Sequence, residues 1–390
     1  VETLILWFAV WLGWQYTCWA TNWFDPQLPR IRSLLFATML AALVMAAAIP
    51  EAFGERGLIF ACDSGGRGLR PDEFGDYFRA TRWYTAPGHD TPGGHADLRK
   101  GKVSASIAAL YHRPRVWLEG YHSLGWGATP ERLMLATREN YLYGCTLLNL
   151  HGLYYTTHGS FWEWAPPCYH FRMPYWEHLG AFLKYFERLS YLMSQGVPRC
   201  DVAVLYPVAP YEAQMGASQA TETAFAAGAK LFQSGRDFLF MDHESLARAQ
   251  VRDGRLHVAD MSFRVLVLPA MQAVRWSTLE KARDLFRQGG IVLALGALPE
   301  ASDRAGAEDP ALDAAVKELL GTTAAEARAG ARPPAQTNAA GGSGLALLGG
   351  GEVAARRYDG GFVGRWLDAG LGPKRAVQLA IGISLLGIIA

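Results

Sequence analysis

Short apolar segments alternate with helix-forming segments through the centre of the chain. Residues 116–121 and 145–155 have the apolar character of strands, whereas 129–140 and 175–195 show helical charge spacing or amphipathicity. Residues 102–111 fit either a short helix or a buried strand. Because strands that alternate with helices pair in parallel through βα units, this order restricts the region to a parallel α/β fold.

A second α/β pattern covers residues 201–320. Its buried-strand segments are separated by helical segments and lie at 201–207, 237–241, 263–269 and 291–295. This order predicts a small doubly wound, Rossmann-like unit. No G-x-G-x-x-G motif follows Leu205, so the sequence gives a nucleotide-binding role little support.

Two long segments near the amino terminus contain no charged residue. They cover 3–24 and 33–50, and each is close to the ~20 residues that a helix needs to span a bilayer. We therefore predict two transmembrane helices within residues 1–61, with a buried helical hairpin as the alternative. Arg30 and Arg32 lie between these helices and favour a cytoplasmic loop, which places the following region on the extracytoplasmic side.

The last part of the chain has two further compositional features. Residues 321–375 are rich in small residues and predict a flexible linker. Residues 376–390 form an uncharged apolar run, which predicts part of a third transmembrane helix. Lys374 and Arg375 precede this run and argue for the opposite orientation in the membrane.

Polar and aromatic side chains follow both central strands. The first strand ends in Glu119, His122 and Trp126, and the second ends in Asn149, His151 and Tyr155. Because the carboxyl ends of parallel strands share one rim, we expect the two groups to converge. Carboxylates that move protons, with aromatic rings that stack on an apolar face, indicate a sugar as the substrate.

A second carboxylate lies in the loop that follows the second strand. Glu163 is flanked by Trp162 and Trp164. Two carboxylates beside aromatic residues are the minimal set of catalytic groups in a glycosidase. One carboxylate protonates the leaving oxygen, and the other activates water or attacks the anomeric carbon. Asp90 lies in the polar segment 87–95, which we interpret as a loop that contacts substrate.

Each candidate residue also has a purely structural explanation. Glu119 could pair with Arg113 or Arg115, His151 could be a hydrogen-bonded core histidine, and Glu163 could be a solvated loop residue. The histidines and the aspartate of 87–95 match no standard metal-site spacing, so we predict no metal site.

Composition excludes several function classes. A formal net charge of +1 and a pI near 7.8 give no electrostatic case for binding nucleic acid. The five cysteines are widely spaced without a C-x-x-C pair, so the sequence supports neither a zinc site nor a disulfide framework.

Residues from about 62 to 300 resemble glycoside hydrolase family 106, the α-L-rhamnosidase-like proteins. The segments that show this resemblance are Ala80–Asp90, Arg113–Trp126, Leu148–Tyr155, Phe161–Pro167 and Arg188–Gly196. The resemblance implies a (β/α)8 catalytic barrel, two catalytic glutamates and an inverting mechanism, followed by a glutaminase-like accessory domain. Glu119 matches the glutamate at the strand end, and Glu163 is our assignment for the second carboxylate. Family members often bind calcium, but no ligand set maps onto this chain, so we predict no cofactor.

Residues 1–61 resemble the low-temperature-requirement A family of bacterial membrane proteins. The segments Thr17–Pro26 and Leu43–Gly54 show this resemblance. The family has more helices than the two found here, so the match implies a fragment of such a protein.

These observations predict a membrane-anchored chimera with five parts. In order they are two transmembrane helices (1–61), a truncated barrel segment (62–200), a small α/β unit (201–320), a linker (321–375) and an apolar tail (376–390). We predict an α-L-rhamnosidase-like hydrolase with carbohydrate and lipid as its partners. Residues 62–200 fall short of the ~250 residues of a complete barrel, so truncation could make it inactive. The alternative is a membrane protein fragment fused to a non-catalytic or carbohydrate-binding domain.

Overall fold

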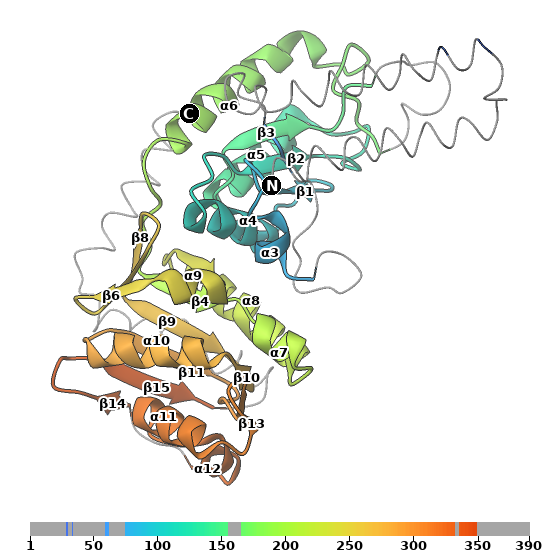
Figure 1. Cartoon of the computed structure of the whole chain (residues 1–390). Helices are drawn as coiled ribbons and strands as arrows, with labels where there is room; N and C mark the ends of the chain where they lie inside the picture. The colour runs from blue at the N-terminus through green and yellow to red at the C-terminus, as the bar shows by residue number, and fades with distance from the viewer. Residues whose placement is uncertain are drawn as a thin grey trace. The chain divides into compact units, whose positions relative to one another are not determined.

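The computed structural model describes residues 29, 33, 59–61, 75–154, 165–331 and 335–348 of the chain (Figure 1). The chain divides into two compact units, Val1–Phe60 and Ala61–Ala390. Apart from residue 33, the predicted spanning segments 3–24, 33–50 and 376–390 lie outside the described residues. Within the described residues, no helix combines the length and apolar character that crossing a bilayer requires.

Three consecutive βα units form the first part of the unit Ala61–Ala390. Their strands make a parallel three-stranded sheet in the order β1-β2-β3. The elements are β1 (Gly88–Thr91), α4 (Leu98–Leu110), β2 (Trp117–Gly120), α5 (Pro130–Leu142), β3 (Leu147–Leu150) and α6 (Leu179–Met193). A short helix, α3 (Tyr77–Thr81), precedes them, and the 3-10 turn η2 (Trp176–His178) leads into α6. This arrangement is the predicted parallel α/β pattern, and residues 102–110 belong to helix α4.

Local sequence signals explain where these helices begin. The side chain of Thr129 caps α5 by accepting a hydrogen bond from the N–H of Arg132, and Pro130 occupies the first helical position, where its missing N–H costs nothing. Asp97 caps α4 in the same way through the N–H of Arg99. Apolar spacing in α6 buries Leu179, Phe182, Phe186 and Leu189.

Residues 88–91 of the segment interpreted above as a loop form strand β1, so the loop prediction was wrong for these four residues. No apolar pattern marks this strand, because its buried positions are occupied by polar side chains. His89 and Thr91 are both buried, and both hydrogen-bond to Oδ1 of Asn140 in α5. Internal hydrogen bonds thus replace the apolar side chains that usually identify a buried strand.

The second part of this unit is built on a six-stranded sheet in the order β14-β15-β11-β9-β4-β5. All neighbouring strands are parallel except β14, which runs antiparallel at one edge. The strands are β4 (Val202–Leu205), β5 (Phe238–Met241), β9 (Val265–Pro269), β11 (Ile291–Leu295), β14 (Gln336–Thr337) and β15 (Ser343–Leu347). The five parallel strands have the doubly wound order 2-1-3-4-5, as the buried-strand patterns predicted in outline.

Helices and two small sheets complete this part (Figure 1). The helices are α7 (Val208–Glu212), α8 (Ala217–Gln233), α9 (His243–Arg248), α10 (Trp276–Arg287), α11 (Pro310–Leu320) and α12 (Ala324–Arg328). One small sheet is the antiparallel meander β6 (Gln250–Arg252), β7 (Arg255–Val258) and β8 (Met261–Phe263). The other contains β10 (Ala273–Val274), β12 (Ala301–Ser302) and β13 (Gly306–Ala307).

The predicted flexible linker is wrong for residues 321–331 and 335–348. These residues form α12, β14 and β15, and β15 pairs along its whole length with β11. The glycines that suggested flexibility allow close packing instead. A Cβ at Gly344 would lie 1.8 Å from the carbonyl oxygen of Leu319, and one at Gly342 would lie 1.8 Å from that of Phe286.

Helix α4 is buried against both the three-stranded and the six-stranded sheet. On one side Ser104 Oγ lies 3.4 Å from Nδ1 of His89 in β1. On the other side Ser106 Oγ accepts a hydrogen bond of 2.8 Å from the N–H of Phe240, and Lys102 pairs with Asp237. Strand β5 is the edge of its sheet, so α4 covers an edge that would otherwise expose unpaired backbone groups.

Candidate functional site

Three polar side chains lie at one level across the parallel sheet β1-β2-β3. Asp90 in β1 is the register partner of Glu119 in β2, and Glu119 is the register partner of Asn149 in β3. All three residues occupy the last two positions of their strands. They therefore meet at the carboxyl rim, which we define as the carboxyl ends of β1, β2 and β3 with the loops that follow them.

The direction of these side chains follows from their buried neighbours. His89 contacts α4 and α5 through Ser104 and Asn140, so it points toward the helices. Successive side chains of a strand point to opposite faces, so Asp90 projects from the face opposite to His89, where Lys100 reaches it from the first turn of α4. Its register partners Glu119 and Asn149 share that face, which in a (β/α)8 barrel is the interior.

Two histidines from the loops of the carboxyl rim lie close together. The ring centroids of His122 and His151 are 5.4 Å apart, and that of Tyr154 lies 6.2 Å from His151. The backbone holds both loops, because the N–H of His151 donates to the carbonyl of Gly120 and the N–H of Gly93 donates to that of His122, each at 2.7 Å. Nε2 of His122 lies 3.9 Å from Oδ2 of Asp90. The predicted convergence of the two strand ends is thus present for Glu119, His122, Asn149 and His151.

Lys100 is a residue of this site that the sequence analysis missed. Its ammonium lies 2.5 Å from Oδ1 of Asp90 and 3.0 Å from the carbonyl oxygen of Asp90, and its side chain is only 4 % exposed. This pair fixes one Asp90 oxygen and leaves the carboxylate facing His122. The sequence does single out this lysine, since Lys100 and Lys102 are the only charged residues in the otherwise uncharged segment 100–110.

Below the carboxyl rim, His89 is held as a neutral imidazole. It is fully buried, and burial lowers the pKa of its ring to about 4. Nε2 lies 3.2 Å from Oδ1 of Asn140, so this nitrogen carries the proton and donates. The same burial raises the pKa of Tyr121, whose hydroxyl donates to Thr137 Oγ1 at 2.7 Å. These groups form a buried polar layer under the rim.

The remaining predicted residues have different positions. Trp126 lies in the loop between β2 and α5 with 43 % of its surface exposed. Tyr155, Trp162 and Glu163 fall in 155–164, outside the described residues. Of the two arginines that could have paired with Glu119, Arg113 donates to the carbonyl of Arg82 and Arg115 donates to the carbonyl of Ser190.

Metal binding finds no support in the described part of the chain. There, no group of three or more His, Cys, Asp or Glu side chains is arranged to hold a metal ion. Cys145 is fully buried, and burial raises its pKa, so it packs as an inert thiol. The carboxyl rim has carboxylates and imidazoles, which can move protons, and an amide that can bind hydroxyl groups.

Two family models match separate regions of the chain. Residues 84–340 match the model described as alpha-L-rhamnosidase (Glyco_hydro_106), which covers both α/β parts. Residues 1–63 match the model described as bacterial low temperature requirement A protein. Both matches agree with the resemblances inferred from the sequence.

Solved structures and one curated sequence are also similar to this chain. The rhamnosidase from Novosphingobium sp. PP1Y superposes with a TM-score of 0.55 at 14% identity, over 84% of this chain and 30% of that one. The GH42 β-galactosidase Gan42B from G. stearothermophilus superposes with a TM-score of 0.53 at 12% identity, over 73% of this chain and 43% of that one. An uncharacterized protein of Rhizobium meliloti (strain 1021) is 33% identical over 97 residues, which span 22% of this chain and 24% of that protein. The chain thus spans about a third of the solved rhamnosidase, and the structural matches show that the two share an α/β fold over that part.

Proposed function

Because the chain belongs to the alpha-L-rhamnosidase family of glycoside hydrolases, we propose that it cleaves a rhamnose-type glycoside at the carboxyl rim of β1, β2 and β3. The observation that supports this most is the row Asp90, Glu119 and Asn149, with the rings of His122 and His151 beside it. Barrel enzymes have their catalytic groups at this end of the strands.

Glu119 is the proposed acid or base of the reaction. As the acid it gives its proton to the glycosidic oxygen while the bond from that oxygen to the anomeric carbon breaks. A water molecule adds to the anomeric carbon from the opposite face and loses its proton to the second carboxylate, for which Glu163 is the candidate. The sugar is released with inverted configuration, and the leaving alcohol carries the proton from Glu119.

The other residues of the rim are proposed to bind the sugar. Asp90, whose charge is paired with Lys100, is suited to accept hydrogen bonds from sugar hydroxyls. Asn149, His122 and His151 supply further donors and acceptors. The aromatic residues proposed to pack against the apolar face of the sugar ring are Trp126, Tyr155 and Trp162. No cofactor is included in this proposal.

Hydrolysis of aryl α-L-rhamnosides tests the role of Glu119. We expect Glu119→Gln to lower kcat by about 10²–10⁴-fold, which is the usual contribution of a positioned general acid. The loss should be larger for methoxyphenyl than for nitrophenyl rhamnoside, because the poorer leaving group depends more on protonation. The control is Glu177→Gln, at an exposed glutamate of η2.

Two outcomes would contradict this proposal. Equal activity of Glu119→Gln and Glu177→Gln would remove Glu119 from the chemistry. Release of no rhamnose by the unaltered chain would exclude hydrolysis, and binding of the rhamnoside without turnover would then identify a carbohydrate-binding protein.

We further propose that residues 1–61 attach the chain to a lipid bilayer and that the hydrolase part lies on the extracytoplasmic side. The uncharged segments 3–24 and 33–50 and the family match over 1–63 support this proposal. We expect the protein to stay in the membrane fraction after high-salt washing and to need detergent for extraction. Complete release by high salt would overturn the proposal.

A further inference from the structure

Two adjoining hollows lie at the carboxyl edge of the six-stranded sheet, away from the carboxyl rim of β1, β2 and β3. One has a volume of about 260 Å³ and is lined by residues that follow β9, β11 and β15, namely Gln272, Gly296 and Leu348, together with α12. The other has a volume of about 670 Å³ and lies over the connection from α7 to α8. Gln219, in the first turn of α8, lines both, and we call the two together the amide pocket.

The amide pocket lies where the doubly wound topology favours a ligand site. The chain passes from β4 to β5 on one side of it, then crosses to β9 on the other side and continues outward through β11 to β15. The direction of strand order therefore reverses between β4 and β9, which is the switch point. Open α/β sheets bind ligands outside the carboxyl ends of their strands at this point. The larger hollow also falls within the ~300–1,000 Å³ range of small-molecule sites.

Three glutamine side chains give the amide pocket its chemistry. Gln214, Gln219 and Gln272 line it, and in the described part of the chain none of these three side-chain amides has a hydrogen-bond partner. Each amide offers two donors and one acceptor. Gly216 adopts φ +66°, which favours glycine, and a Cβ there would lie 2.5 Å from Oε1 of Gln272, so a larger residue would displace this amide.

The charges around the amide pocket are paired with one another. Glu212 forms an ion pair with Arg275, which also lies 3.6 Å from Asp303, and Arg328 forms one with Glu300. A phosphate or nucleotide site would instead present cations without such partners. The first turn of α8 adds backbone N–H donors, and these can serve a hydroxyl oxygen as well as an anion.

We propose that the amide pocket binds a neutral saccharide through its glutamine amides, with the ring of Tyr211 beside the sugar. Sugar hydroxyls both donate and accept hydrogen bonds, which the amides match, and aromatic rings pack against the C–H face of a sugar. The proposal is independent of hydrolysis, because no residue of the carboxyl rim lines this pocket.

Titration with L-rhamnose, followed by hydrogen–deuterium exchange, tests this site on the full chain. We expect L-rhamnose to protect the backbone at 211–219 and 269–273 from exchange. The variant Gln219→Leu/Gln272→Leu should raise the Kd for this protection at least tenfold, because it removes two sets of hydrogen bonds. The matched control is Gln233→Leu, in the last turn of the same helix, which should leave the Kd unchanged.

The other outcomes would overturn the proposal. They are protection confined to the carboxyl rim, an unchanged Kd in the double variant, and protection of the same segments by inorganic phosphate in preference to L-rhamnose. The last result would identify an anion site at the first turn of α8. None of these results depends on whether Glu119 catalyses hydrolysis, so the two proposals fail separately.

Discussion

His89 shows how a single residue supports the carboxyl rim from below. Its ring is neutral, fully buried and hydrogen-bonded between α4 and α5, next to Asp90 in the chain. Protonation would place a charge in a fully buried position, and Lys100 nearby adds repulsion. The position of Asp90 therefore depends on an imidazole that must stay uncharged.

Acid should destabilise the protein through this residue. The folded pKa of His89, about 4, lies below the ordinary value of 6.5, so the unfolded chain binds a proton first as the pH falls. Stability is therefore complete above pH 6.5 and decreases between 6.5 and 4, by about 3 kcal/mol in total. Urea unfolding at several pH values measures this loss, which should be absent in His89→Gln.

The matched control for this experiment is His95→Gln, at an exposed histidine of the loop after β1. We expect this variant to keep the full pH dependence. If His89→Gln kept it as well, another group would be responsible for the acid sensitivity.

At the scale of elements, α4 joins the two sheets through buried polar contacts. Ser106 Oγ donates to the carbonyl of Lys102 at 2.5 Å and accepts from the N–H of Phe240 at the edge of β5. Lys102 pairs with Asp237, and its ammonium lies 5.5 Å from the ring centroid of Phe232. Helix α4 thus provides a hydrogen-bond acceptor for the backbone of the edge strand β5 in addition to packing against it.

We expect Ser106→Ala to lower the free energy of unfolding markedly, although it removes only one oxygen atom. The substitution leaves the buried N–H of Phe240 without its acceptor, which costs about 1–3 kcal/mol. Chemical denaturation followed by circular dichroism measures the free energy of unfolding. Ser277→Ala, at an exposed serine in α10, should change it by less than ~0.5 kcal/mol, and similar values for the two variants would contradict this account of the β5 edge.

Elements with an apolar period could be predicted from the sequence, and elements held by polar or backbone contacts could not. The strands β2, β9 and β11 and the capped helix α5 lie where the patterns indicated. Strand β1 was missed because its buried side chains are His89 and Thr91, and β15 because glycines permit its close packing. The sequence placed Glu119 and His151 at strand ends, where the structure has them, whereas Lys100 reaches Asp90 through a tertiary ion pair that no local pattern indicates.

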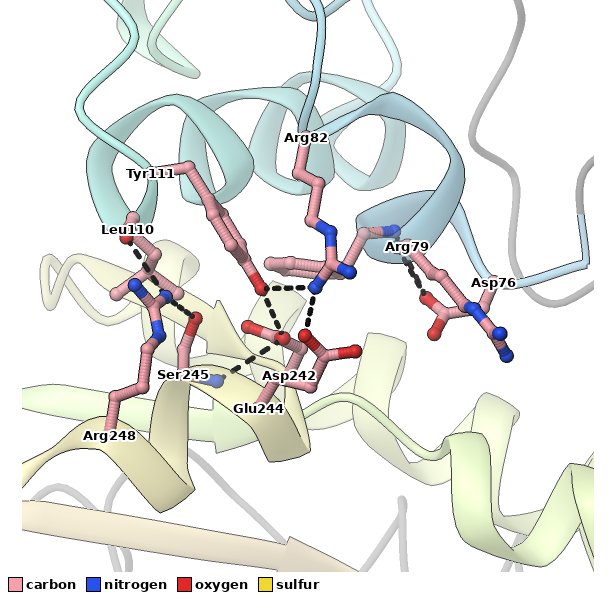
Figure 2. Close-up of polar contacts among 10 residues, drawn as sticks. Asp76, Arg79, Arg82, Leu110, Tyr111, Asp242, Glu244, Ser245 and Arg248 are labelled. Carbon is pink, nitrogen blue, oxygen red and sulfur yellow. Dashed lines mark hydrogen bonds and ion pairs between the residues drawn. The ribbon is translucent and has the colours of Figure 1, made fainter. Parts of the chain in front are cut away.

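At the scale of the whole unit Ala61–Ala390, the core of the second α/β part extends to α3 and α4 of the first, whereas β2, α5 and α6 pack in a second hydrophobic cluster. Buried residues of α3 and α4, including Phe78, Val103 and Ile107, belong to the same hydrophobic cluster as β4, β5 and β9. Figure 2 shows the polar side of this contact, where Tyr111 and Arg82 point toward Asp242 and Glu244 at the start of α9. The hydroxyl of Tyr111 donates to Oδ2 of Asp242 at 2.7 Å. The guanidinium of Arg248 lies 4.6 Å from the ring centroid of Tyr111.

We expect these two parts to unfold in a single cooperative transition. Tyr111→Phe should lower the stability of the entire unit by about 1–3 kcal/mol, because it removes a hydrogen bond to a buried carboxylate. Differential scanning calorimetry should show one transition shifted to lower temperature. Tyr191→Phe, at an exposed tyrosine of α6, is the control. A second transition in Tyr111→Phe would indicate two independently folding domains.

The burial of α4 on both sides has a consequence for how such proteins can be recombined. A crossover placed anywhere between residues 111 and 201 would exchange the second sheet while keeping the helix that covers its edge. The new sheet would then have to supply a partner for the ammonium of Lys102 and a backbone donor for Ser106. We therefore expect the barrel segment and the sheet that follows it to be inherited as a pair, and functional chimeras to need breakpoints ahead of α3.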